Sequence, residues 1–100
     1  MPADYDQFLT LDARLTILRA LAKQTDGRLN ETILSAELDS FGHRRSREWV
    51  RTQIEFLREV GAVTVTEAGS VKVPSITRLG IAHVERRQII EGVGRPSPEA

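Results

Sequence analysis

The segment from His43 to Val63 constrains the fold more than any other part of the chain. It begins with an arginine cluster and continues with Ser46, a residue type typical of helix N-caps. Apolar residues at helical spacing follow, up to Gly61, a typical helix stop. Directly after this glycine the pattern changes to alternating β-branched residues. The segment therefore predicts a helix with a basic start that leads straight into a β-hairpin.

The helix predicted over residues 46–60 is amphipathic. Its apolar residues recur three and four positions apart, as in a helix that covers a core. Trp49 is the only tryptophan, and we expect it to fill space between this helix and the hairpin. The apolar face consists of Val50, Ile54 and Leu57, broadened by Trp49, Phe56 and Val60.

Two β-branched stretches, residues 62–66 and 71–73, surround a turn at residues 67–70. They predict a hairpin over about 62–75, which would be the wing of a winged helix-turn-helix. Pro74 has no amide hydrogen, so it should weaken the second strand at its end.

Two helices are predicted before this segment. After a short helical lead-in over residues 2–9, Thr10 is a suitable N-cap for a helix that ends near Gln24. Asn30 caps the second helix and Gly42 ends it. A short loop separates the second helix from the third, which favours the steep crossing of a helix-turn-helix. The predicted apolar face of the second helix is Ile33, Leu34, Leu38 and Phe41.

Smaller elements complete the expected fold. Residues 28–29 can form a very short strand beside the hairpin. Thr77 caps a fourth helix, in which Gly80 indicates close packing against another helix. We expect an α+β, mostly α, winged helix-turn-helix, with a three-helix core, a β-hairpin wing and a C-terminal helix. This domain should span residues 1–91, followed by a flexible tail over residues 92–100.

The composition excludes several classes of protein. One hundred residues with 40% hydrophobic content suit one small domain. The absence of cysteine excludes disulfides, zinc fingers and thiol catalysis. His43 and His83 are far apart and have no acidic cluster beside them, so we expect no metal and no cofactor. We expect His43 in an exposed turn, where it could approach a phosphate, and His83 at the surface or in an interface. No catalytic triad, phosphate loop or paired-carboxylate motif is present, and we expect a protein that is not an enzyme. With no long apolar run and no signal-like start, it should be cytoplasmic.

The net charge is zero, but the charge is unevenly spread. Residues 1–42 carry four basic and seven acidic side chains, a net charge of −3. Residues 43–100 carry ten basic and seven acidic ones, a net charge of +3. Since local field matters more than total charge for docking on phosphate, the second half is the candidate DNA-binding region. An arginine run also fits an ordinary solvated surface.

The third helix predicts a surface that fits the major groove of DNA. Arg47 and Arg51 lie one turn apart, opposite the apolar face, and could bond guanine. Thr52 could touch a thymine methyl group or a phosphate. Glu55 could accept from cytosine or simply pair with Arg51.

Further contacts come from the ends of this region. Arg44 and Arg45 precede the cap and suit backbone phosphates. Lys72 in the wing could reach an adjacent groove. The predicted DNA-contacting residues are Arg44, Arg45, Ser46, Arg47, Arg51, Thr52, Glu55 and Lys72.

Two stretches resemble ArsR-type winged-helix repressors. Residues 12–22, Asp-Ala-Arg-Leu-Thr-Ile-Leu-Arg-Ala-Leu-Ala, look like their first core helix. Residues 46–63, ending Phe-Leu-Arg-Glu-Val-Gly-Ala-Val, look like their recognition helix and its exit into the wing. The metal-sensing cysteines of many ArsR members are absent, so metal sensing does not carry over. The resemblance also implies a homodimer through terminal helices, here residues 2–20 and 78–90.

A second resemblance covers nearly the whole chain. Its motifs are Phe8-Leu9-Thr10, Arg28-Leu29-Asn30-Glu31, Phe41-Gly42-His43-Arg44, Arg51-Thr52-Gln53 and Gly94-Arg95-Pro96. They are similar to a family of small proteins of Mu-like phages and prophages, described mainly as winged-helix or ArsR-like. This resemblance implies phage origin and brings no catalytic residue.

Two functions follow as hypotheses. The first is a sequence-selective binder of double-stranded DNA that regulates transcription by inserting helix 46–60 into the major groove. The alternative is a phage assembly or DNA-packaging accessory protein that uses the same fold for protein–protein or non-specific DNA contacts.

Overall fold

The computed structural model describes residues 2–98, and this part of the chain is an α+β fold that is mostly helical. It contains helices α1 (Pro2–Ala22), α2 (Glu31–Ser40), α3 (Arg47–Glu59) and α4 (Arg78–Val84). Strands β1 (Val63–Ala68) and β2 (Val71–Ile76) form an antiparallel hairpin between α3 and α4. The expected class and order of elements are confirmed. None of the helices over residues 2–98 is both long enough and apolar enough to cross a membrane.

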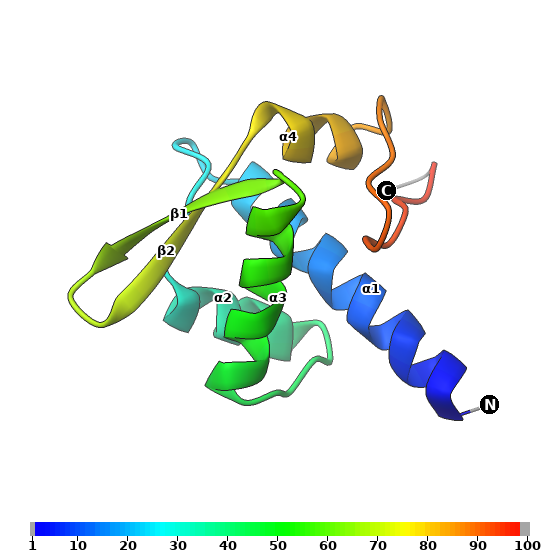
Figure 1. Ribbon diagram of the computed structural model, residues 1–100, viewed down its shortest axis with the longest axis horizontal. Coiled ribbons are helices and arrows are strands. Elements are labelled where there is room, and N and C mark those ends of the chain that lie inside the picture. The colour runs from blue at the N-terminus through cyan, green and yellow to red at the C-terminus, as the bar shows by residue number, and fades with distance from the viewer. Residues whose placement is uncertain (1, 99–100) are drawn as a thin grey trace.

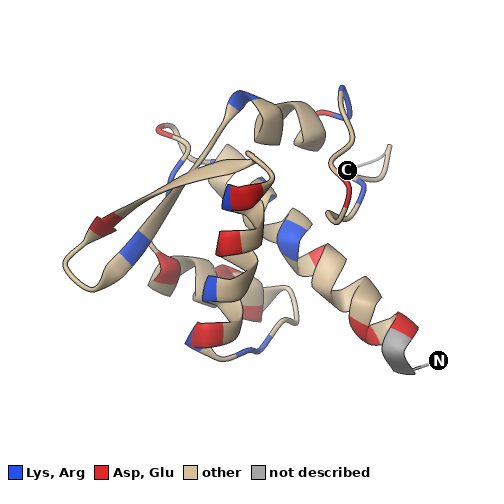
Figure 2. Cartoon of the chain, viewed as in Figure 1, with Lys and Arg blue, Asp and Glu red and all other residues tan. Residues whose placement is uncertain are grey.

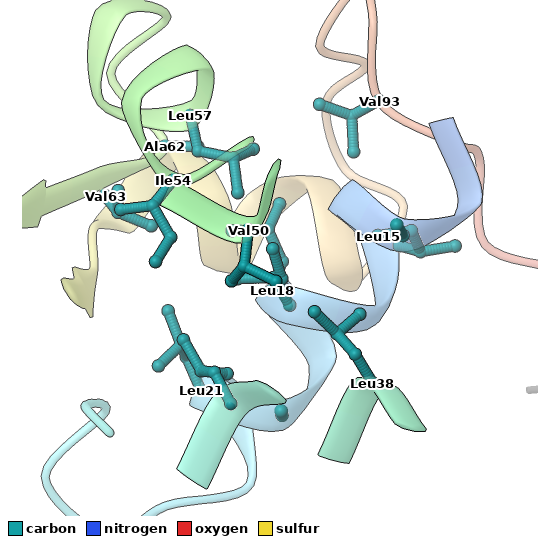
Figure 3. Close-up of a cluster of buried hydrophobic side chains, with 14 of the residues drawn as sticks. Leu15, Leu18, Leu21, Leu38, Val50, Ile54, Leu57, Ala62, Val63 and Val93 are labelled. Atoms are coloured by element: carbon teal, nitrogen blue, oxygen red, sulfur yellow. The ribbon is translucent and has the colours of Figure 1, made fainter. Parts of the chain in front are cut away.

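The C-terminal half of α1 is the centre of the fold. This helix contacts α2, α3, α4 and β2, and Figure 1 shows its C-terminal half passing behind α3. Leu18 and Leu21 of α1 are fully buried beside Leu38 of α2 and Val50 of α3 (Figure 3). The expected apolar residues of α3, namely Val50, Ile54 and Leu57, all lie in this core.

The first helix begins earlier than predicted. Thr10 is not an N-cap but an interior residue of α1, and its hydroxyl donates to the carbonyl of Asp6 at 3.0 Å. A threonine can satisfy its hydroxyl within a helix in this way, so its presence does not require a helix start. The lead-in and the core helix are therefore one continuous helix. Its N-terminal half extends away from the body as an arm (Figure 1).

The other three helices begin at the predicted caps. The side chain of Asn30 accepts from the amide of Ile33 at 2.9 Å. Ser46 accepts from the amide of Trp49 at 3.1 Å, and Thr77 from the amide of Gly80 at 3.2 Å. Each cap satisfies one of the amide hydrogens that a helix leaves free at its start.

Glycines end α2 and α3 as predicted. Gly42 and Gly61 have φ values of +92° and +85°, a left-handed conformation that favours glycine. In each case the following amide, of His43 or Ala62, donates to the carbonyl five residues earlier at 2.8 Å. This is the Schellman motif, and it turns the chain sharply after α2, into the α2–α3 loop, and after α3, into β1.

The hairpin covers the predicted residues within one position at each end, but its strands are longer than the two β-branched stretches. Its strands pair from Val63 with Ile76 to Ala68 with Val71, and β2 continues through Pro74. The proline carbonyl still takes part, because it accepts from the amide of Leu29 at 3.4 Å. The expected short strand beside the hairpin is confirmed by an antiparallel bridge between residues 28 and 75.

The buried side of α2 differs from the prediction. Its buried residues are Glu31, Leu34 and Leu38, whereas Ile33 is 47% exposed and Phe41 is 59% exposed. The buried face of α2 therefore starts at Glu31 and continues at Leu34 and Leu38, three and seven positions further along the helix. The prediction, which used hydrophobicity alone, placed Ile33 on this buried face and left Glu31 outside it.

The packed body extends beyond residue 91, where we expected a tail to begin. Ile90 and Val93 are buried, and the amide of Gly94 donates to the carbonyl of Leu11 at 2.9 Å. His83, expected on the surface, is 1% exposed and holds this segment. Its Nε2 lies 2.7 Å from the carbonyl of Gly94, and its Nδ1 accepts from the amide of Ile90 at 3.1 Å.

Gly80 packs closely, but not against another helix. A β-carbon at this position would lie 2.5 Å from the carbonyl oxygen of Ala62 and 2.7 Å from the side chain of Ile76. Gly80 thus packs against Ala62, which follows α3, and against Ile76 at the end of β2.

We therefore expect Gly80→Ala to lower the free energy of unfolding by about 1–3 kcal/mol, because the added methyl group overpacks against backbone. Helix propensity alone predicts the opposite, a gain of up to about 1 kcal/mol. Urea denaturation measures the sign. Thr32→Ala at an exposed position of α2 is the control, with a gain of roughly 0.5 kcal/mol expected. A stabilised Gly80→Ala protein would contradict the packing described.

Candidate functional site

The candidate site consists of the exposed side of α3, the loop before it and the hairpin. The start of α3 and the tip of the hairpin both lie on the side of the molecule away from α4 (Figure 1). An open groove of about 660 Å³ lies between α3 and the hairpin. Its charged lining includes Arg51, Glu55 and Arg58 from the helix and Glu67 and Lys72 from the strands.

The arginines at the start of α3 are exposed. Arg44 keeps 85% of its side chain in solvent, although its Nε lies 2.7 Å from a carboxylate oxygen of Asp39. The guanidinium of Arg45 lies 4.6 Å from the ring centre of Trp49, a cation–π contact. Arg47 makes no hydrogen bond or ion pair with any residue between 2 and 98. Trp49 is half-buried: part of its side chain packs against the core, and its ring also contacts Arg45.

Arg51 has a different role from its neighbours. Its Nε and Nη2 donate to the two carboxylate oxygens of Glu31 at 2.7 and 2.8 Å, a bidentate pair. The same Nη2 donates to the carbonyl of Ser70 in the hairpin turn at 2.9 Å. Only 31% of its side chain is exposed. These contacts occupy the side of the guanidinium that guanine recognition needs.

Glu31 joins three elements. Besides the pair with Arg51 of α3, its Oε2 accepts from the backbone amide of Lys72 in β2 at 2.7 Å. Its side chain is 1% exposed. The carboxylate at the start of α2 therefore fixes the hairpin relative to α3.

The bond from Arg51 is the main reason that the pKa of Glu31 falls to about 2 from its usual 4.5. Burial opposes this change, while the amide of Lys72 and the charge of Arg47 add to it. A carboxylate that accepts hydrogen bonds from a charged side chain and from a backbone amide stays ionised in this way.

The remaining predicted contact residues are engaged locally. The hydroxyl of Thr52 donates to the carbonyl of Glu48 at 3.0 Å. Glu55 pairs with Arg58 and not with Arg51, the partner that we considered. The bonds from Arg58 lower the pKa of Glu55.

The wing lysine is also paired. Lys72 Nζ lies 3.2 Å from Glu67 across the hairpin. Figure 2 shows the result along α3 and the hairpin, where acidic and basic positions alternate. Within α3, the loop before it and the hairpin, an excess of positive charge is therefore confined to the loop and the first turn of α3.

Two polar side chains, those of His43 and Arg14, hold the loop and the tail, and neither role was predicted. His43, expected in an exposed turn, is 6% exposed, and its Nε2 lies 2.9 Å from Asp12 of α1. Arg14, expected on the outer side of α1, donates to Gln53 at 2.9 Å and to the carbonyl of Gly92 at 2.7 Å.

The guanidinium of Arg14 also lies 3.7 Å from the ring centre of Phe56, and burial lowers its pKa. The sequence offers no signal for these contacts, since the partners are 31 to 78 positions apart.

Comparisons with known proteins give two relatives. A protein of Escherichia phage Mu, gp26, is 41% identical over 95 residues, which cover 95% of this chain and 98% of the phage protein. A Haemophilus influenzae protein is 38% identical over 61 residues, which cover 61% of this chain and 59% of that protein's length. Neither relative's name states an activity. No family model and no solved structure matches.

We expect Glu31→Gln to lower the free energy of unfolding at pH 7 by about 2–3 kcal/mol, because Arg51 loses its ionised partner. Arg51 is partly exposed, which keeps the loss below that of a fully buried pair. Since the pKa of Glu31 is depressed when folded, its contribution is complete above pH 4.5 and is lost as pH falls towards 2.

The measurement is urea denaturation of both proteins between pH 7 and pH 2.5. The difference between them should shrink on the acid side of pH 4.5. The matched control is Glu55→Gln, which removes an exposed carboxylate from an arginine pair and should change stability far less. Equal effects of the two substitutions would refute the special position of Glu31.

Proposed function

Since the chain belongs to the family of the phage Mu protein gp26, we propose that it is a winged-helix protein of a Mu-like phage or prophage that binds double-stranded DNA and regulates transcription. The order of elements supports the winged-helix assignment. Three helices are followed by a hairpin, and the bridge between residues 28 and 75 supplies the small third strand.

The observation that carries the proposal is the group of arginines around the start of α3. Arg44, Arg45 and Arg47 are exposed, and they surround the N-terminal end of a 13-residue helix. Phosphate binds well at such an end because free amides and the helix dipole favour anions. Helix-turn-helix proteins place this same end of the recognition helix in the major groove.

The contacts suggest a division of labour among the predicted site residues. Arg47 is the side chain best suited to a base edge, and Thr52 follows five positions further along α3. Arg44 and Arg45 suit phosphates, where binding depends little on base sequence. Ser46 holds the helix start, and Arg51 holds the wing, a role that we propose in place of guanine recognition.

A second candidate function is supported by the alternating charges. A recognition surface that reads DNA along its whole length is usually basic, whereas most of α3 is charge-balanced (Figure 2). This balance favours an assembly or DNA-packaging accessory protein that contacts protein, or contacts DNA only through the first turn of α3.

Fluorescence anisotropy with DNA duplexes from the phage genome tests the proposal. We expect binding that weakens with salt, and Arg44→Ala, Arg45→Ala and Arg47→Ala together should reduce the salt slope by about 2–3. Restoring Arg47 alone should recover the preference for one sequence.

Arg58→Ala is the matched control, since it removes an arginine from the other end of the same helix and should leave affinity nearly unchanged. No binding at low salt, or equal losses in both proteins, would refute DNA docking by the start of α3. Capture of a phage head or terminase protein by the wild-type chain would then support the accessory role.

A further inference from the structure

The arm of α1 carries an apolar surface that the rest of residues 2–98 leaves uncovered. Tyr5 is 64% exposed and Phe8 is 61% exposed. They are three positions apart, so they lie on the same side of the helix. Ile89 of the C-terminal segment, 56% exposed, lines the same depression as Phe8, together with Leu11 and Leu15. Separate parts of the chain thus meet in one apolar patch.

The two ends of this patch carry opposite charges. Asp4 lies four positions from Phe8, on the same side of the arm, and its carboxylate pairs with no residue between 2 and 98. Asp6 adds a second carboxylate to the arm, and it too pairs with no residue between 2 and 98.

The other end of the patch is basic. Arg95 lines the depression beside Phe8 and also an adjoining one of about 230 Å³, where Arg86 is its neighbour. Neither guanidinium has an ion pair within the described part of the chain. Glu91 and Asp12 line the first depression as well, but Asp12 is paired with His43, so the two arginines face one carboxylate that has no partner among residues 2–98.

We propose that a second copy of this chain covers the patch, with the two α1 arms antiparallel. In a twofold arrangement the acidic arm of each copy lies on the basic C-terminal segment of the other, so Asp4 meets Arg95 of the second copy twice. This dimer differs from a pairing of terminal helices, because residues 85–98 contain no helix.

The exposed apolar area suits such a dimer. An aromatic side chain buries 150–250 Å² when covered, so Tyr5, Phe8 and Ile89 of both copies offer roughly 700 Å². An interface of about 1,200 Å², the lower end of the stable class, is a little under two-thirds apolar. The patch therefore supplies the apolar part of a modest interface. Because interfaces of this size are at the weak end of the stable class, we expect a Kd of about 1–100 μM.

Sedimentation equilibrium over a range of concentrations measures the dimer. Asp4→Lys should weaken it at least about tenfold, because a cation then faces Arg95, and Arg95→Glu should do the same through Asp4 and Glu91. An equimolar mixture of these two variants should form dimers again, since both arm contacts become complementary in the heterodimer. Higher salt should weaken the wild-type dimer.

Phe8→Ser tests the apolar part, and Phe41→Ser, at an aromatic residue of similar exposure in a separate depression beside the C-terminal half of α1, is its control. Only the first should weaken the dimer. A wild-type chain that is monomeric up to about 500 μM, or a mixture that does not recover, would overturn the proposal. A stable dimer that ignores Asp4, Arg95 and Phe8 would also overturn it. These measurements report mass alone, so their outcome does not depend on DNA binding.

Discussion

The buried carboxylate of Glu31 is the constraint on which the arrangement of the wing depends. It stands at the start of α2, is held by Arg51 of α3, and accepts from the amide of Lys72 in β2. The hairpin has few other polar ties to α3, and it contacts the helices mainly near its base, where Val63 is buried. Because a charge in the interior is tolerated only with such partners, the three elements must come together as one unit.

Local signals in the sequence were sufficient for the ends of most elements. Asn30, Ser46 and Thr77 act within three residues, so capping chemistry is visible without a fold. Long-range partners were not predictable. Glu31 looked like a first-turn acid that complements a helix dipole, because its partners lie 20 and 41 positions away. His83 looked like a surface residue for the same reason, since the fold of the C-terminal segment buries it.

The candidate site shows the same limit of prediction from sequence. Helical spacing makes Arg47 and Arg51 equivalent, since both lie opposite the apolar face. The structure separates them, because only Arg51 lies across from Glu31 and the hairpin turn. Spacing reports which side of a helix a residue occupies, whereas the neighbouring elements decide whether its charge is available. The cations that remain available are those at the first turn, before α3 meets the hairpin.

The packing of the C-terminal segment affects when the protein can fold. Ile90 and Val93 close the core beside Leu15, and Gly94 is bonded to Leu11 in the middle of α1. The ribosome makes α1 first and this segment among the last residues of the described chain. Until residues 90–94 have left the ribosome, the nascent polypeptide therefore carries an open apolar face on its first helix. The core closes only when two segments about 80 positions apart meet, so its completion is one of the last steps in folding of the described chain.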